Sequence, residues 1–315
     1  MITRRALLRV LAGLGLAGAA TGGYAGWVVP GAQPVIARYR PALPGWPGEL
    51  TLRIAAIADV HIGPPAMPRD RVAEIVAAAN ALAPDLIVLL GDYVATHRFQ
   101  RARIPVGDFA AEAAALRAPL GVYAVMGNHD WRDDAAAQRR RAGPIAGALA
   151  LQEAGIAVLE NEARRIQAPG GAFWLAGLGD QWAFGHPVRG RTRGVDDLPG
   201  TLAQIDDDAP VLLLAHEPDI FPRVPARVAL TLSGHTHGGQ IRVLGYAPVV
   251  PSLYGRRYAH GHIVEDGRHL IVSAGLGCSG VPLRFGIPPE IVLVDLGAPA
   301  RTRIKAARAP ARDTA

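Results

Sequence analysis

The segment GHTHGGQ, residues 234–240, places two histidines one residue apart among glycines, directly after the apolar run VALTLS. Four other apolar runs also end in polar residues: ADVH at 58–61, GDY at 91–93, GNHD at 127–130 and AHEP at 215–218. Imidazole, carboxylate and amide oxygen together are the ligands of borderline divalent metals such as zinc, iron and manganese. The residues of these motifs that could serve such a site are Asp59, His61, Asp92, Asn128, His129, His216, His235 and His237.

This set holds too many ligands for one ion. If one carboxylate is shared, the set fits two ions about 3.5 to 4 Å apart, the spacing of a two-metal hydrolytic site. Each motif alone is weak, because a strand followed by Asp or His occurs often by chance, and a lone histidine in a glycine-rich loop is usually just a polar loop residue. Five such motifs, which use five of the ten histidines, are better explained by two metal sites.

The elements that would position these side chains follow from the apolar periodicity. Residues 70–84 and 108–119 have helical spacing, and a polar, arginine-rich helix is expected at about 133–154. Short, near-continuous apolar runs predict strands covered on both faces, at 51–58, 85–91, 121–127, 156–160, 172–179, 210–215, 227–233, 269–275 and 290–296. The pattern favours an α/β domain with two stacked sheets flanked by helices. Because ligands bind outside the carboxyl ends of parallel strands, the polar residues are expected to converge.

The ordered series DxH, GD, GNHD, H and GHTH resembles the calcineurin-like metallophosphoesterase superfamily, over about residues 52–296. The resemblance implies a four-layer α/β/β/α fold of two mixed sheets and two divalent ions, drawn from manganese, zinc and iron. It implies that Asp92 bridges the ions and that a bridging hydroxide attacks phosphorus in line with the leaving group. By the same resemblance, the first ion takes Asp59, His61 and His237, and the second takes Asn128, His216 and His235.

The resemblance also assigns a catalytic histidine. His129 would be protonated, and would stabilise developing negative charge or protonate the departing oxygen, a role usually worth about 10² to 10⁴ in rate. Asp130 would orient its ring. Arg284, in PLRFG, is a candidate for bidentate contact with a substrate phosphate. A surface arginine packed on Phe285 is an equally good interpretation of that position.

Differences between branches of the superfamily narrow the expected reaction. Its Ser/Thr protein phosphatases carry GD followed by a V-D-R-G run and GNHE, whereas this chain has GDYVATH and GNHD. It therefore lacks the Asp-Arg pair that helps grip a phosphomonoester. The opening segment, GDYV, GHTHGGQI and GLGCSGVPLRFGIPPEIVLVDL resemble a bacterial YkuE- and YaeI-like branch of phosphodiesterases, which are often exported or membrane-attached. A phosphomonoesterase and a catalytically silent metal-binding scaffold are the alternatives, and the intact ligand series favours an enzyme.

The sequence leaves the native substrate open. A relative in the broader superfamily cleaves the pyrophosphate of UDP-2,3-diacylglucosamine, so a lipid-linked or cell-envelope phosphoester is a candidate. That particular substrate is cytoplasmic, which disagrees with the expected location of this domain. Trp174, Trp182 and Phe184 would suit an apolar lip for a lipid, although aromatic residues in strands and loops more often pack in the core.

The first thirty residues predict a targeting segment. TRRALLR resembles a twin-arginine export signal, and the uncharged stretch from Val10 to Val29 is just long enough to span a bilayer. We expect residues 1–30 to be a signal or membrane anchor, with the body outside the cytoplasm because the arginines precede the apolar stretch. The remaining expected segments are a Pro/Gly linker at 31–49, the catalytic domain at 50–297 and a basic mobile tail at 298–315.

Composition excludes some classes of partner. The formal charge is +6, but the two termini contain eight cationic residues against one acidic residue, so the body is nearly neutral and a nucleic-acid-binding face is not supported. The single cysteine, Cys278, excludes an intramolecular disulfide and is expected to be a packed thiol. No obligate protein partner is evident, and the 50% hydrophobic content suffices for a sizeable core.

Overall fold

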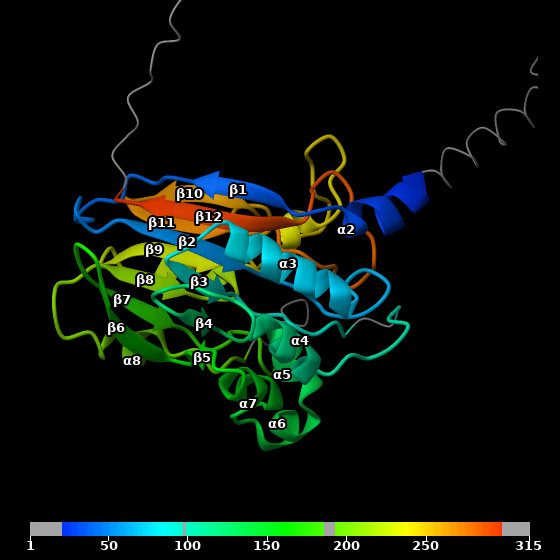
Figure 1. Cartoon of the computed structure of the whole chain (residues 1–315), viewed down its shortest axis with the longest axis horizontal. Helices are drawn as coiled ribbons and strands as arrows, with labels where there is room; N and C mark the ends of the chain where they lie inside the picture. The colour runs from blue at the N-terminus through cyan, green and yellow to red at the C-terminus, as the bar shows by residue number, and fades with distance from the viewer. Residues whose placement is uncertain (1–20, 97–98, 186–192, 298–315) are drawn as a thin grey trace, which may run out of the picture.

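The structure is a computed structural model, which describes residues 21–96, 99–185 and 193–297 (Figure 1). The described residues form two stacked sheets of six strands each. In the first sheet the order is β1 (Val35–Tyr39), β12 (Glu290–Leu296), β2 (Leu52–Ile57), β3 (Leu86–Leu89), β4 (Val122–Ala124) and β5 (Ala157–Val158). In the second it is β10 (Gly261–Glu265), β11 (Arg268–Val272), β9 (Val228–Ser233), β8 (Val211–Leu214), β7 (Gly171–Gly177) and β6 (Glu162–Ala168).

Both sheets are mixed, and their central strands are parallel. Strands β2 to β5 run parallel to one another, and β12 is antiparallel to β2. In the second sheet β7, β8, β9 and β11 run parallel, with β6 and β10 antiparallel at the two edges. The carboxyl ends of the parallel strands therefore provide the loops that can build a site.

The alternation of side chains along the strands creates a core on each face of each sheet. In β2, Ala55 and Ile57 pack toward helices α3 (Arg69–Ala81), α4 (Val106–Ala113) and α7 (Ala146–Glu153), which cover the first sheet (Figure 1). Ile54 and Ala56 point the other way, into the core between the sheets. Short helices α8 (Leu198–Leu202) and η3 (Pro218–Arg223) cover the second sheet's outer face. The predicted two-sheet α/β fold is confirmed.

Three strands were missed, because each lies at a sheet edge or carries polar residues on one face. Strand β1 lies within the expected linker and pairs in parallel with β12, so the sheet begins before residue 50. Strand β6 has the sequence EARRIQA and β10 has GHIVE, and neither contains a continuous apolar run. A search for strands buried on both faces therefore did not detect these strands, which are covered on one face only.

The range of about 133–154, expected to be one helix, contains two helices instead, and a third helix ends at its first residue. They are α5 (Asn128–Asp133), α6 (Ala135–Arg140) and α7. Asp134 divides the first two, because its extended backbone ends α5 and its carboxylate accepts hydrogen bonds from the N–H groups of Ala136 and Ala137 at the start of α6.

At the amino-terminal end of the described chain are the one-turn helix η1 (Tyr24–Val28) and α2 (Val29–Gly31). The twin-arginine motif and most of the apolar stretch lie outside the described residues, as does the expected tail at 298–315. Among the residues that are described, no helix combines the length and apolar character needed to cross a membrane.

Removal of β1 is expected to destabilise the domain. A chain that begins at residue 50 would expose the edge of β12 and lose the packing of Ile36 against the helical core. Loss of this buried apolar surface is expected to lower the free energy of unfolding by about 2 kcal/mol or more, equivalent to a fall of roughly 4 to 8 °C in melting temperature. Thermal denaturation of chains beginning at residues 32 and 50 measures this difference, and equal melting temperatures would show that β1 is dispensable.

Candidate metal centre

The predicted site residues lie in five loops at the carboxyl ends of parallel strands. Asp59 and His61 follow β2, Asp92 follows β3, and Asn128 begins α5 after β4. His216 follows β8, while His235 and His237 follow β9, with His237 in the short helix η4 (His237–Gly239). The two sheets therefore contribute residues to one shared, buried cluster.

One half of the cluster gathers around His237. Its Nε2 lies 3.0 Å from Nε2 of His61 and 3.6 Å from Oδ1 of Asp59. The Nε2 of His61 is also 3.6 Å from Oδ2 of Asp92. Asp59, His61 and His237 form a group whose ligand atoms are all close enough to hold one ion.

The other half gathers around His216. Its Nε2 lies 3.3 Å from Oδ2 of Asp92 and 3.2 Å from Nδ1 of His235. The Asn128 amide presents one terminal atom to Nδ1 of His235 at 3.1 Å and the other to the Arg132 guanidinium. Asp92, His216 and His235 form a second group with ligand atoms close enough to hold an ion. Oδ2 of Asp92 thus lies between the two halves.

Backbone carbonyls fix which ring nitrogen of His61 and of His216 faces the cluster. Nδ1 of His61 lies 3.0 Å from the carbonyl of Val94, and Nδ1 of His216 lies 2.6 Å from that of Leu90. A carbonyl only accepts, so both Nδ1 atoms carry protons, and each Nε2 is the atom left to bind a metal ion. Burial opposes protonation of His216, but the Asp92 carboxylate that faces its Nε2 raises its pKa well above the usual value. A cation in place of this proton would be held by both Nε2 atoms and Asp92, with the carbonyls as outer partners that orient each ring.

The charges of the cluster agree with this interpretation. Burial raises the pKa of Asp59 to about 8, which shows how unfavourable a second uncompensated carboxylate is here. Burial also opposes ionisation of Asp92, but the protonated His216 beside it outweighs this effect and holds the pKa of Asp92 well below the usual range. Burial lowers the pKa values of His235 and His237, so both rings are neutral, the form that binds metal.

The ligand loops are held in a strained backbone conformation. Left-handed φ angles between +47° and +69° occur at five candidate ligands: Asp59, His61, Asp92, His235 and His237. Each such residue costs of order 1 to 3 kcal/mol, and clustering of this strain is typical of functional sites. Gly127 permits the close approach of two loops, because a Cβ there would lie 2.3 Å from Oδ1 of Asp92.

His129 lies beside the cluster and is held by two hydroxyl groups. Its Nε2 is 4.0 Å from Oδ2 of Asp92 and 3.2 Å from Oγ of Ser279, and its Nδ1 contacts Oγ1 of Thr96. Burial lowers the pKa of His129 to about 3, so the ring is neutral rather than protonated as the sequence analysis expected. Sequence reasoning missed Thr96 and Ser279, because hydroxyl residues in loops show no spacing pattern.

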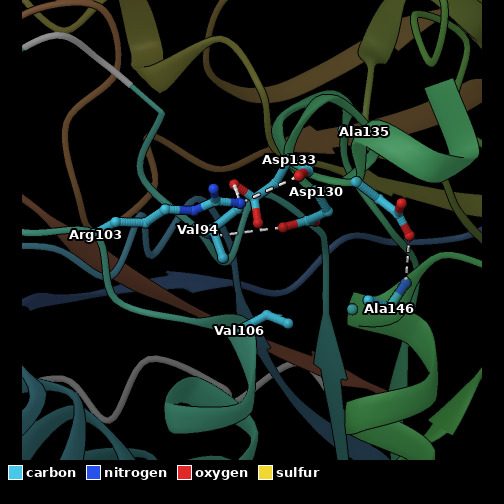
Figure 2. A pocket seen from close by; sticks show the side chains of 9 residues that line it. Val94, Arg103, Val106, Asp130, Asp133, Ala135 and Ala146 are labelled. Atoms are coloured by element: carbon cyan, nitrogen blue, oxygen red, sulfur yellow. Dashed lines mark hydrogen bonds and ion pairs between the residues drawn. The ribbon is translucent and has the colours of Figure 1, made fainter. Parts of the chain in front are cut away.

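Asp130 does not orient the His129 ring. Its carboxylate accepts hydrogen bonds from the backbone N–H groups of Asp92, Tyr93 and Gly127, at 2.8 to 2.9 Å, and from Val94 at 3.4 Å. Figure 2 shows the Asp130 side chain directed at Val94, beside a cavity that the ion pair of Arg103 and Asp133 borders. Asp130 therefore anchors the loop that carries Asp92.

Arg284 is fully buried. Its guanidinium donates to the carbonyls of Ala274, Gly277 and Pro288 and lies 3.3 Å from Nδ1 of His237. The interpretation of Arg284 as a surface residue was wrong, and its complete burial gives no support to contact with a substrate phosphate. Cys278, also buried, lies beside it, as expected for a packed thiol.

Replacement of Arg284 by methionine is expected to destabilise the protein. Three backbone carbonyls would lose their donor, at a cost of about 3 kcal/mol or more, equivalent to a melting temperature lower by roughly 6 to 12 °C. Thermal denaturation without substrate measures this. A raised KM with an unchanged melting temperature would instead support contact with substrate.

Two of the three aromatic residues considered for a lip are buried, and the third is half-buried. Trp182 is buried with its ring edge-on to His235, their centroids 4.2 Å apart. Trp174 is buried and donates from Nε1 to Asp207, and Phe184 packs against Trp131. Of these side chains, Trp182 therefore contacts a candidate metal ligand from inside the protein.

Comparison with known proteins decides the family. Residues 52–239 match the family described as calcineurin-like phosphoesterase, and this range contains all seven candidate ligands. The chain belongs to the calcineurin-like phosphoesterases. Members of this family are hydrolases of phosphoester bonds, and the buried cluster of His and Asp residues is the part of this phosphoesterase suited to divalent metal.

Several relatives of this phosphoesterase are similar over most of the chain. It is 32% identical to phosphodiesterase YaeI of Escherichia coli (strain K12), over 94% of this chain and 100% of that protein. It is 31% identical to the uncharacterized metallophosphoesterase YkuE of Bacillus subtilis (strain 168), over 78% of each chain. A transmembrane protein with metallophosphoesterase domain of Bos taurus is 30% identical over 80% of this chain and 54% of its own length.

Proposed function

We propose that this phosphoesterase is a binuclear metal-dependent phosphodiesterase. The observation that supports this most is the position of Oδ2 of Asp92, at 3.6 Å from Nε2 of His61 and 3.3 Å from Nε2 of His216. One carboxylate oxygen thus lies between a ring nitrogen from each half of the cluster. Two divalent ions, from manganese, zinc and iron, would be held by Asp59, His61 and His237 on one side and Asn128, His216 and His235 on the other, with Asp92 shared.

The chemistry would be hydrolysis of a phosphodiester or pyrophosphate. The bound ions would supply neutralisation of phosphoryl charge and activation of a water nucleophile. The water oxygen forms a bond to phosphorus, one P–O bond breaks, and the departing oxygen takes a proton. His129, beside the cluster and held by Ser279 and Thr96, donates a hydrogen bond toward the phosphoryl or departing oxygen.

Three observations support a diester over a monoester substrate. The chain lacks the Asp-Arg pair found in the protein phosphatases of the superfamily, and Arg284, the other candidate to grip a phosphate, is buried under backbone carbonyls. A relative that the chain covers completely is named a phosphodiesterase.

The proposal includes location outside the cytoplasm. The paired arginines before an uncharged stretch support export or anchoring, and some relatives are named transmembrane proteins. A phosphoester of the cell envelope or of a lipid is the substrate class that such a location would offer.

Comparison of two chromogenic substrates tests the proposed function. The full-length protein is stripped of metal, restored with manganese, and assayed with bis(p-nitrophenyl) phosphate and p-nitrophenyl phosphate. Metal-dependent cleavage with preference for the diester is expected. Preference for the monoester would replace the proposal by a phosphomonoesterase, and two bound metals without cleavage of either would favour the metal-binding scaffold.

A further inference from the structure

A cavity of about 390 Å³ adjoins the candidate metal centre. This volume lies within the range of small-molecule sites, about 300 to 1,000 Å³. His237 and Ser279 line one part of it, and both belong to the site described above. The cavity is therefore continuous with the position where a substrate phosphate would bind.

The rest of the cavity offers an apolar surface. Its body is lined by Ile241, Pro248, Val249, Pro251 and Val281. The polar side chains Gln240 and Thr236 also line it, but both are engaged with the protein backbone. Gln240 donates to the carbonyls of Ser279 and Val281 and accepts from the N–H of Ser279. A ligand that fills this cavity thus has a polar end at the metal centre and an apolar remainder.

The loop that forms one wall, residues 241–254, is unusually apolar at its surface. Half of the exposed large hydrophobic side chains among the described residues lie in it: Val243, Leu244, Tyr246, Val249, Leu253 and Tyr254. Clustered exposure of this kind marks a binding surface for protein, lipid or ligand, in contrast to isolated exposed side chains.

Leu244 stands at the tip of this loop in an unfavourable conformation. The backbone N–H groups of Val243 and Tyr246 each bond to the other residue's carbonyl, which closes a two-residue turn. Leu244 and Gly245 have φ angles of +49° and +81°. Asn, Asp or Gly would suit the first position better than leucine. The chain nevertheless holds a fully exposed leucine there, which a purely structural turn does not require.

Charge favours a lipid surface as the partner of this loop. The sequence contains no acidic residue between Asp219 and Glu265, whereas Arg242, Arg256 and Arg257 lie within or just after the loop. The guanidinium of Arg256 lies over the ring of Tyr246, 4.4 Å from its centroid. Arg257 pairs with Glu265, and the Asp219 carboxylate accepts a hydrogen bond from the N–H of Leu253, so the loop offers Arg242 and Arg256 to an anionic surface. Apolar side chains, tyrosines and arginines together are the combination found where proteins rest on anionic membranes.

The amino-terminal segment packs against residues close to this cavity. Ala25 accepts a hydrogen bond from the N–H of Arg284, and the ring of Tyr24 packs edge-on against Phe285. The segment that contains these partners follows Ser279 and Val281 along the cavity wall. Helix α2 and the 241–254 loop lie at the same end of the molecule (Figure 1). The uncharged stretch that precedes Tyr24 thus joins the domain beside the cavity.

We propose that this cavity binds the hydrocarbon chain of a lipid phosphodiester, with the phosphate at the His237 and Ser279 end, while the 241–254 loop rests on the bilayer that holds the lipid. The inference rests on the proposed phosphodiesterase function and names its substrate class. A second copy of the chain or an apolar peptide are the other occupants that the test must distinguish.

A series of p-nitrophenyl alkyl phosphates tests the cavity. The methyl, butyl and octyl esters differ only in chain length and share the scissile bond. Each buried methylene is worth about a three- to fourfold gain in kcat/KM, so the octyl ester should exceed the methyl ester by at least about 100-fold even with partial burial. Val249→Asp, at the exposed side of the cavity, should reduce this gain below about tenfold, because it lowers kcat/KM for the octyl ester far more than for the methyl ester. Val264→Asp, at a similarly exposed valine on β10, is the matched control and should retain the gain.

The outcomes separate the cavity from the reaction. No dependence on chain length, with normal hydrolysis of the methyl ester, would overturn the cavity proposal and leave the phosphodiesterase intact. No hydrolysis of any ester by the metal-loaded protein would overturn both. A dimer in solution that Val249→Asp dissociates would assign the cavity to a second copy instead.

A second variant tests the loop at a membrane. p-Nitrophenyl hexadecyl phosphate in phosphatidylcholine vesicles containing phosphatidylglycerol presents the substrate in a bilayer. Leu244→Asp should lower kcat/KM on these vesicles by about tenfold or more, because a charge at the loop tip opposes insertion. It should leave hydrolysis of the soluble methyl ester unchanged, and Val264→Asp should affect neither. Equal rates for Leu244→Asp and the wild type on vesicles would contradict membrane contact by this loop.

Discussion

Replacement of Asp92 by asparagine is expected to lower kcat/KM for bis(p-nitrophenyl) phosphate by at least about 10³. The expected cause is the loss of the one carboxylate oxygen that faces both halves of the cluster. The amide keeps the size of the side chain but removes its negative charge, so two cations would no longer be compensated. Metal analysis of the purified variant should show fewer than two ions per chain, which is a readout independent of activity.

A matched variant separates this effect from the general cost of altering a buried carboxylate. Asp295, in β12, is also largely buried, and its carboxylate pairs with Arg40 and Arg53. Its partner in the sheet is Arg53, near the start of β2, whereas the site follows the end of β2. Asp295→Asn should therefore retain both metals and activity within about threefold. A wild-type rate for Asp92→Asn would remove the basis of the two-metal proposal.

Replacement of His129 by alanine is expected to lower kcat by about 10² to 10⁴ while the protein keeps its metals. The ring lies beside the cluster, with Nε2 at 4.0 Å from Oδ2 of Asp92, but it belongs to neither proposed ligand set. Its loss should therefore affect the chemical step more than metal affinity. Stopped-flow or steady-state kinetics with metal analysis on the same sample measures both quantities.

The control for this variant is a second histidine whose ring is buried. His269 is buried on β11, where its Nδ1 lies 3.0 Å from Nε2 of His262. His269→Ala should reduce stability without a comparable loss of kcat. If His129→Ala instead loses metal in proportion to activity, His129 is a ligand and not the group that contacts substrate.

The sequence predicted the strands that are buried on both faces and failed at the edges. Strand β12 was predicted with the bounds that it has, since EIVLVDL fills cores on both sides of the first sheet. Strand β6 has an exposed face and the sequence EARRIQA, which lacks the apolar run that the prediction depended on. Burial on both faces leaves a signature in one chain, whereas an edge strand is defined by its neighbour.

The candidate site likewise has a part that the sequence predicted and a part that it did not. The convergence of the candidate ligands follows from their positions after parallel strands, a rule that needs only local sequence. The partners of Asp130 and Arg284 are backbone groups of other loops, so their roles depend on how those loops fold and have no local signature. The contacts of Thr96 and Ser279 with His129 have the same origin.

The most direct test of the two-metal centre is a crystal structure of the protein grown with manganese, with anomalous differences measured near the manganese edge. The account predicts two peaks about 3.5 to 4 Å apart, on either side of Oδ2 of Asp92. One peak should contact Asp59, His61 and His237, and the other Asn128, His216 and His235. A single peak, or peaks that do not share Asp92, would contradict the binuclear site from which the proposed reaction follows.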